Sequence, residues 1–147
     1  MKKIAIFVDV QNIYYTTRDT YKRQFNYRQF WPRISAEGEI TIANAYAINR
    51  GDDQQIKFQD ALKHIGFSVK LKPYIQRSDG SAKGDWDVGI TIDVLEAAPQ
   101  VDKVILLSGD GDFDRLLEKI KQTHAVETAV YGVRKLTAAL SLIHNRR

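Results

Sequence analysis

Apolar segments with strand character alternate with helical segments along the chain, and this alternation limits the fold more than any other feature. The clearest segment is the run 3–8, which is apolar after Lys3 up to Asp9 and is typical of a strand buried on both faces. Further strands are predicted at 39–48, 67–74, 103–107 and 126–131. Strands joined through helices form a mostly parallel sheet with helices on both faces. We therefore expect one α/β domain, 1–147, with a five-stranded sheet in the order 3-2-1-4-5.

Helical patterns fill the spaces between these strands. Helices are predicted at 11–21, 54–65, 85–97, 112–123 and 134–143. A helix at 25–35 is expected to be broken, because Pro32 lacks the backbone N–H that a helix interior needs. Residues 76–84, which are rich in glycine, serine and charged side chains, are predicted to form a loop.

The composition is that of a cytoplasmic globular protein. No cysteine occurs, which excludes a disulfide scaffold, a thiolate zinc site and a cysteine nucleophile, and suits a reducing compartment. The first apolar run ends at Asp9 and is shorter than the roughly 7–15 residues of a signal-peptide core. No segment approaches the ~18 apolar residues of a membrane span. We therefore expect a cytoplasmic protein that does not enter a membrane.

Basic residues exceed acidic ones by a small margin, and many of them are clustered. Lys and Arg number 22 against 18 Asp and Glu, which gives a formal charge of +4. Within 18–33, basic and aromatic side chains alternate: Arg18, Lys22, Arg23, Arg28 and Arg33, with Tyr21, Phe25, Tyr27, Phe30 and Trp31. Such a stretch suits a phosphate backbone with stacked bases. It equally suits a helix with a solvated charged face and aromatics turned into the core, and the sequence leaves both interpretations open.

Several acidic residues lie where the predicted strands end. Asp9 directly follows the first strand, Asp110 and Asp112 follow the fourth, and Asp85 and Asp87 begin the helix that leads into the fourth. Ligands of such sheets bind at the carboxyl ends of the strands, where the winding direction switches between strands one and four. Carboxylates that converge there repel one another unless a divalent cation neutralises them, and without imidazole or thiolate partners they favour Mg²⁺ or Mn²⁺. Each aspartate alone could instead cap a helix or a turn.

Other chemistries lack support in the sequence. The acidic run that starts at Asp110 has the spacing of a calcium loop, but an EF-hand needs Gly and Glu where this chain has Arg115 and Lys121. No Gly-Lys-Ser/Thr phosphate loop occurs, and no Gly-x-Gly-x-x-Gly follows the first strand. The histidines have no ligand spacing, and Ser108 lies outside a nucleophile elbow.

Three short motifs occur in a fixed order along the chain. They are Phe-Val-Asp-Val-Gln-Asn at 7–12, Lys-Gly-Asp-Trp-Asp at 83–87 with Asp93 further on, and Ser-Gly-Asp-Gly-Asp-Phe at 108–113. Together they resemble the NYN domain family, and within it the LabA-like branch of the PIN-like nucleases. The resemblance covers nearly the whole chain and implies a compact PIN-like, Rossmannoid domain with an acidic centre.

The resemblance also suggests which residues form the site. The family's Asp-x-x-Asn pattern falls on Asp9 and Asn12. Its Lys-Gly-x-Asp pattern falls on Lys83 and an acidic pair, because this chain carries one extra residue before the aspartate. Asp87 is aligned with the family acid because the positions after it then keep their usual offsets, and Asp85 stays an alternative.

The function that the resemblance implies is metal-dependent hydrolysis of RNA phosphodiester bonds with Mg²⁺ or Mn²⁺. Asp9, Asp87 and Asp110 would hold the metal. Asp112 would either ligate it or hold a metal-bound water.

Two further residues are candidates for substrate binding. Asn12 would orient a carboxylate or touch the phosphate, and Lys83 would contact the phosphate backbone. Asp93 lies six residues beyond Asp87, which on a helix places it about 240° around the axis and ~9 Å away, so we do not expect it beside Asp87.

Two other functions stay open. A catalytically silent RNA-binding or regulatory module would keep the same acidic pocket. A haloacid dehalogenase-type phosphatase needs a second acid two residues after its nucleophilic aspartate, and here Gln11 stands two residues after Asp9. The expected partner is nucleic acid, foremost single-stranded RNA, while a homodimer is left open.

Overall fold

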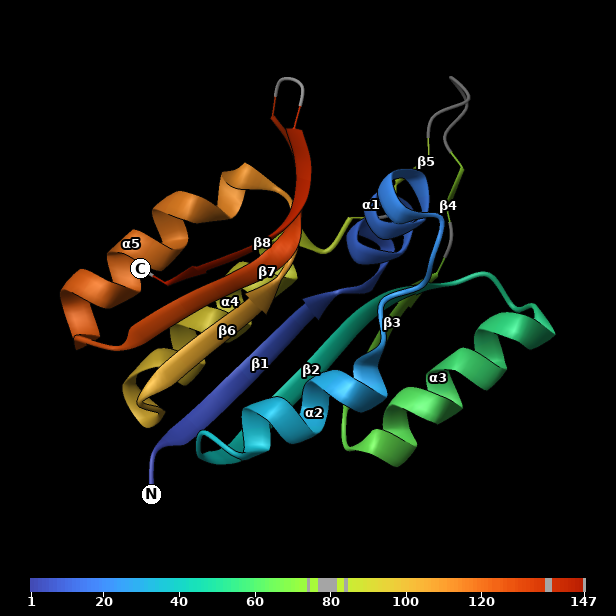
Figure 1. Cartoon of the computed structure of the whole chain (residues 1–147). Helices are drawn as coiled ribbons and strands as arrows, with labels where there is room; N and C mark the ends of the chain where they lie inside the picture. The colour runs from blue at the N-terminus through green and yellow to red at the C-terminus, as the bar shows by residue number, and fades with distance from the viewer. Residues whose placement is uncertain (74, 77–81, 84, 137–138, 147) are drawn as a thin grey trace.

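The computed structural model describes residues 1–73, 75–76, 82–83, 85–136 and 139–146, with side chains described over 1–72 and 85–133 (Figure 1). The strands of its main sheet are β1 (Lys3–Asp9), β2 (Glu39–Asn49), β3 (Ser68–Pro73), β6 (Lys103–Leu107), β7 (Glu127–Leu136) and β8 (Ala139–Arg146). A small second sheet pairs β4 (Ile75–Gln76) with β5 (Ala82–Lys83). The helices are α1 (Val10–Tyr21), α2 (Tyr27–Ser35), α3 (Asp53–Ile65), α4 (Asp87–Ala97) and α5 (Asp114–His124), with the short 3₁₀ helices η1 (Ala98–Gln100) and η2 (Gly111–Phe113).

The main sheet has the strand order β3-β2-β1-β6-β7-β8. The pairs from β3 to β7 are all parallel. This confirms the α/β class and the predicted order 3-2-1-4-5, in which β6 and β7 are the fourth and fifth strands. The chain winds outward from β1 in both directions, so the switch point lies between β1 and β6.

The helix predicted at 134–143 is wrong. This segment forms the end of β7 and most of β8, which pair antiparallel from Ala129 with Arg146 to Leu136 with Ala139. Its leucine- and alanine-rich composition favours a helix locally. Pairing with β7 overrides this preference, because β8 satisfies the backbone groups along the side of β7 that β6 leaves open.

Two smaller predictions also differ from the structure. The helix at 25–35 was expected to break, yet α2 runs through Ser35 with Pro32 inside it, and it begins where Asn26 Oδ1 accepts the Gln29 N–H at 3.1 Å. The loop predicted at 76–84 is bounded by β4 and β5, which pair Ile75 with Lys83. Residues 77–81 and 84 lie outside the described part of the chain.

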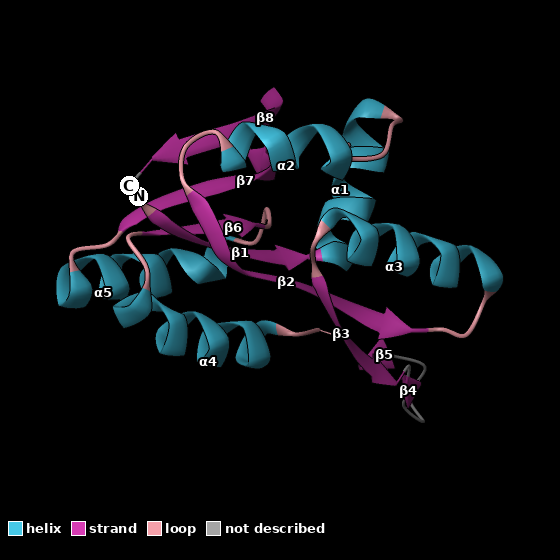
Figure 2. Cartoon of the chain, turned by 90° about the horizontal axis from the view of Figure 1, so that it is seen from below, coloured by secondary structure: helices cyan, strands magenta, loops and turns pink. Residues whose placement is uncertain are grey.

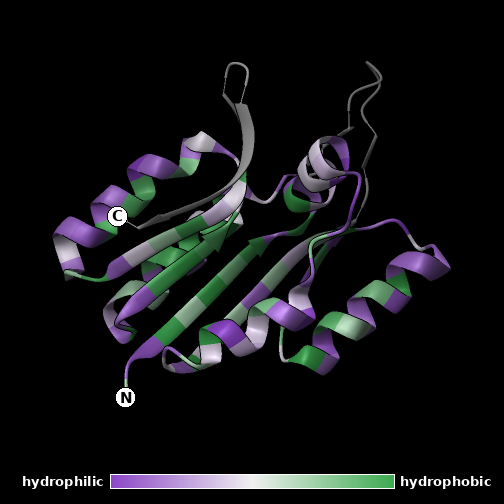
Figure 3. Cartoon of the chain, in the orientation of Figure 1, coloured by the Kyte–Doolittle hydropathy of each residue, from purple (hydrophilic) through white to green (hydrophobic). Residues whose placement is uncertain are grey.

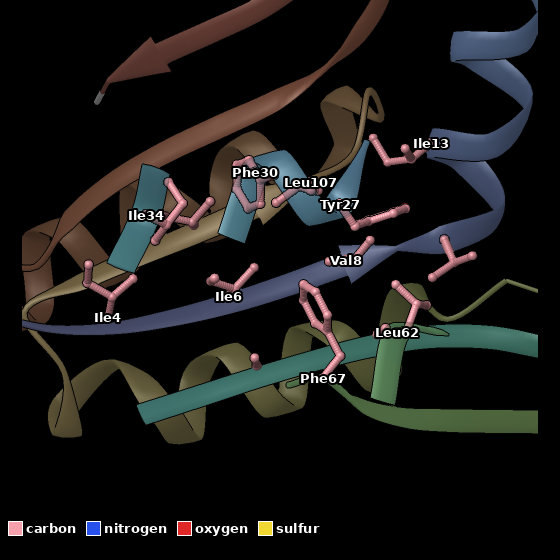
Figure 4. Close-up of a cluster of buried hydrophobic side chains, with 14 of the residues drawn as sticks. Ile4, Ile6, Val8, Ile13, Tyr27, Phe30, Ile34, Leu62, Phe67 and Leu107 are labelled. Carbon is pink, nitrogen blue, oxygen red and sulfur yellow. The ribbon is translucent and has the colours of Figure 1, made fainter. Parts of the chain in front are cut away.

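Helices cover both faces of the sheet, as the sequence predicted (Figure 2). Successive residues of a strand point to opposite faces. Ile4, Ile6 and Val8 of β1 therefore face α1, α2 and α3, where they form one core cluster (Figure 4). Ala5 and Phe7 face α4 and α5 in a second cluster. The apolar strands lie inside and the polar helix faces outside (Figure 3).

Within the described part of the chain, no helix has the length and apolar composition that a bilayer span requires.

Candidate metal centre

The carboxyl ends of β1 and β6 place two of the predicted acidic residues at one edge of the sheet. Val8 pairs with Leu107 in parallel register, so the residues that follow them lie at the same edge. Asp9 ends β1 directly before α1. Asp110 lies in the turn after β6, where its Oδ1 accepts the Asp112 N–H at 2.9 Å and begins η2.

Asp87 reaches this edge because the start of α4 is fixed against the end of β2. The Trp86 indole Nε1 donates to the carbonyl oxygen of Ala47 at 2.9 Å, and its ring lies 5.2 Å from that of Tyr46. Asp87 follows as the first residue of α4. Asp85 takes a different position, since its Oδ1 accepts the Asp87 N–H at 3.3 Å.

Three carboxylates come together at the switch point. Asp87, Asp110 and Asp112 each offer an oxygen, and these oxygens all lie within 4.8 Å of one another. Ligands around a single divalent cation have this separation, because oxygens bind Mg²⁺ or Ca²⁺ at about 2.0–2.6 Å. Among the side chains that the structure describes, no lysine or arginine forms an ion pair with any of the three.

Asp9 lies beside this group without being one of its three members. The Ser108 hydroxyl donates to Asp9 Oδ2 at 3.2 Å and accepts the Asp110 N–H, also at 3.2 Å. Ser108 is fully buried, so its hydroxyl ties the end of β1 to the turn after β6. From the sequence, Ser108 was assessed only as a nucleophile, and this role was missed. Its place between two predicted acids is the signal that could have revealed it.

The electrostatics of the site disfavour its own negative charge. Burial raises the pKa of Asp9 to about 6, with a further increase from the charge of Asp87, while hydrogen bonds from Ser108 and the Asn12 backbone partly oppose the increase. Burial also raises the pKa of Asp87 to about 6, and the negative charges of Asp110 and Asp85 add to it. A bound cation reverses this balance, because it stabilises the ionised carboxylates.

Asn12 holds the turn after β6 in place. Its Oδ1 accepts the Gly109 N–H at 2.7 Å, which joins the first turn of α1 to that loop. β7 packs closely against this turn at Gly109, since a Cβ added at position 109 would overlap the carbonyl oxygen of Val133. Asn12 thus contacts the backbone of the acidic turn through Oδ1, and the predicted contact with a carboxylate or a phosphate stays a prediction.

The other sequence-derived candidates lie apart from the carboxylates or outside the described side chains. Asp93 accepts hydrogen bonds from the Tyr46 hydroxyl at 2.7 Å and Lys70 Nζ at 3.0 Å, which agrees with the expectation that it does not pair with Asp87. Lys83 belongs to β5, but its side chain is outside the described part.

The aromatic residues of the basic stretch mostly enter the core. Tyr27 and Phe30 are buried in the first cluster, and Phe25 and Trp31 pack against it. Tyr21 remains exposed. For 25–31 the structure therefore favours the second interpretation, a helix with its aromatic face turned inward.

Comparisons with known proteins agree with this architecture. The model of the NYN domain matches residues 3–146. The Low amplitude and bright protein LabA of Synechococcus elongatus is 32% identical over an alignment of 141 residues, and the match covers 89% of this chain and 75% of that protein. A crystal structure of a protein of unknown function from Vibrio parahaemolyticus is 57% identical, with a TM-score of 0.86, and the match covers 93% of this chain and 85% of that one.

Proposed function

Because the chain belongs to the NYN domain family, we propose that it is a metal-dependent nuclease that hydrolyses phosphodiester bonds of RNA in the cytoplasm. The observation that carries this proposal is the group of three carboxylates at the switch point. Among the side chains that the structure describes, no lysine or arginine forms an ion pair with them. The donor set fits Mg²⁺ or Mn²⁺, because it consists of carboxylate oxygens without imidazole or thiolate.

The residues take the following roles in this proposal. Asp87, Asp110 and Asp112 hold the ion. When bound, the ion supplies neutralising charge to the phosphate and lowers the pKa of a bound water. Asp9 adjoins the three acids and orients the attacking water, with its own carboxylate held by the Ser108 hydroxyl.

This assignment differs by one residue from the set Asp9, Asp87 and Asp110 derived from the sequence. Asp112 becomes a ligand, one of the two roles that the sequence left open for it, and Asp9 becomes the neighbour of the ligand set. Asn12 is a positioning residue, since it holds the Gly109 backbone and with it the acidic turn. Lys83 stays a candidate for contact with the phosphate backbone.

The test is cleavage of labelled single-stranded RNA by protein freed of metal and then supplied with Mg²⁺, Mn²⁺ or EDTA. We expect products with Mg²⁺ or Mn²⁺ and none with EDTA. Asp87→Asn and Asp110→Asn each lose a charged ligand and are expected to slow cleavage at least about 100-fold. Asp60→Asn is the matched control, because it removes the same charge from an exposed position in α3.

Each alternative gives a different result in this assay. RNA that is retained without products in every metal identifies a binding module. A DNA strand of the same sequence, run in parallel, decides between ribonuclease and deoxyribonuclease. Cleavage that persists in EDTA, or that survives both site substitutions, contradicts the proposal.

A further inference from the structure

A groove of about 860 Å³ opens between α1 and α3. This volume lies within the range of ligand pockets. The groove is bounded by α1, the segment that leads into α2, the end of β2 and α3. Its lining includes Val10 and Gln11, the two residues that follow Asp9.

The groove is lined by aromatic rings and by positive charge. Arg18, Arg28 and Arg50 line it against one acidic residue, Asp52. The Arg18 guanidinium lies 4.9 Å from the centre of the Tyr15 ring and 5.4 Å from that of Tyr14. The aromatic residues of the lining are Tyr14, Tyr15, Phe25, Tyr27 and Phe58. Tyr27 belongs to the first core cluster, and Phe25 and Phe58 pack against it, so the exposed ring is that of Tyr14. Arginine suits phosphate groups, and exposed aromatic faces suit nucleobases of any sequence.

The groove is connected to the metal centre through neighbouring residues. Tyr27 lines the groove, and its pKa is raised by burial and, to a smaller extent, by the charge of Asp9. Ala47 also lines the groove, and its carbonyl oxygen accepts the hydrogen bond from Trp86 that fixes the residue before Asp87. A strand that reaches the acids can therefore continue into the groove.

We propose that this groove binds a nucleotide of single-stranded RNA next to the phosphate at the metal centre. Its base stacks on Tyr14, and Arg18 and Arg28 contact the adjoining phosphates. Tyr14 is 40% exposed and therefore presents its ring to a ligand. The inference rests on the proposed function for its substrate. It adds a subsite that draws the negative strand towards an acidic centre, which by itself repels phosphate.

The first test measures the affinity of labelled single-stranded RNA in Ca²⁺ by fluorescence anisotropy. Tyr14→Ala is expected to weaken binding by roughly 5- to 150-fold, the equivalent of about 1–3 kcal/mol for one stacked base. Tyr21→Ala is the matched control, because Tyr21 lies in the same helix, is 41% exposed and is outside the groove. We expect its affinity to equal that of the parent.

The second test varies the salt concentration. Each phosphate contact on a single strand contributes about 0.7 to the slope of log affinity against log salt, so Arg28→Gln is expected to flatten the slope by about 0.7. Arg33→Gln is the control, since Arg33 is an exposed arginine of the same helix outside the groove.

An RNA with abasic positions should bind the parent more weakly but lose no further affinity with Tyr14→Ala.

The outcomes separate this inference from the proposed function. Binding that depends on Tyr14 and Arg28 supports the groove even if no RNA is cleaved. Cleavage with equal affinities for Tyr14→Ala and Tyr21→Ala overturns the groove and leaves the nuclease proposal standing. The inference is also overturned if the parent does not bind RNA, or if Tyr14→Ala changes the oligomeric state in sedimentation without changing RNA affinity, because a second copy of the chain is then the occupant.

Discussion

Charged side chains gather at both ends of the parallel strands, which we call the amino edge and the carboxyl edge of the sheet, but their charges are balanced in opposite ways. At the amino edge, the fully buried Lys103 forms ion pairs with Glu37 at 2.7 Å and Glu127 at 3.7 Å, and Lys2 joins Glu127 at 3.2 Å. The Lys3 N–H donates to Asp102 at 2.8 Å. Every one of these charges finds its partner within the chain, so this edge contributes to the structure itself.

At the carboxyl edge, charges of one sign gather. One carboxylate oxygen from each of Asp87, Asp110 and Asp112 lies within 4.8 Å of the other two. The pKa of Asp9 and that of Asp87 are raised to about 6. Such an arrangement lowers the stability of the metal-free fold, and proteins keep such costs mainly at functional sites. The proposed divalent cation explains this contrast, because it would supply the positive charge that the described lysine and arginine side chains do not bring to the three acids.

The largest effect on stability is expected at the amino edge. Lys103→Met removes the buried cation from a partly buried network and leaves two glutamates without it, which we expect to lower the free energy of unfolding by about 3 kcal/mol. Lys70→Met is the control, because Lys70 forms an exposed pair with Asp93 that contributes about 0–1 kcal/mol. Urea denaturation measures both. Equal effects would mean that the amino edge is not a structural network.

At the carboxyl edge, ionised side chains should lower the free energy of unfolding, and its dependence on pH should show this. The pKa of Asp9 is about 6 in the fold against 3.8 as its ordinary value, so the fold favours its protonated form. The contribution of Asp9 to the free energy of unfolding is therefore fully present below pH 3.8, and it is lost as the pH rises through 6. For metal-free protein, the parent should lose up to about 3 kcal/mol relative to Asp9→Asn between pH 4 and pH 7. A constant difference in urea denaturation across this range would contradict the pKa of Asp9.

The smallest effects are expected when one aspartate at each edge is replaced by asparagine. The two substitutions should change the free energy of unfolding in opposite directions. In EDTA, Asp110→Asn relieves repulsion while an amide oxygen can still accept the Asp112 N–H, so we expect the free energy of unfolding to rise by about 1 kcal/mol. Asp102→Asn replaces a charged acceptor of the Lys3 N–H by a neutral one and should lower it by about 0.5–1 kcal/mol. A destabilised Asp110→Asn would show that Asp110 is mainly a cap of η2.

The sequence was sufficient to predict the centre of the fold. Apolar runs that end at Asp9 and before Asp110, separated by helices, determine that β1 and β6 lie side by side and that their acidic residues share one edge. The wrong helix at 134–143 shows the limit of this reasoning. Local composition favours helix there, whereas the strand state of β8 depends on its pairing with β7.

The spacing of residues along the sequence does not predict the contacts within the site. Asp112 joins Asp87 and Asp110 because η2 bends the chain directly after Asp110, whereas Asp9 is directed to the Ser108 hydroxyl. The contact of Asn12 with Gly109 joins positions 97 residues apart and has no local signal. The spacing also leaves the choice between Asp85 and Asp87 open, whereas in the structure the group of three carboxylates contains Asp87, which directly follows the Trp86 anchor.

The most direct test of the account is calorimetric titration of the metal-free protein with Mn²⁺ at pH 7. We predict saturable binding by the parent and by Asp60→Asn, and its loss in Asp87→Asn and in Asp110→Asn, because only the last two remove a carboxylate from the group of three. No saturable binding by the parent, or equal binding by all four proteins, would contradict the claim that the carboxyl edge is completed by a divalent cation.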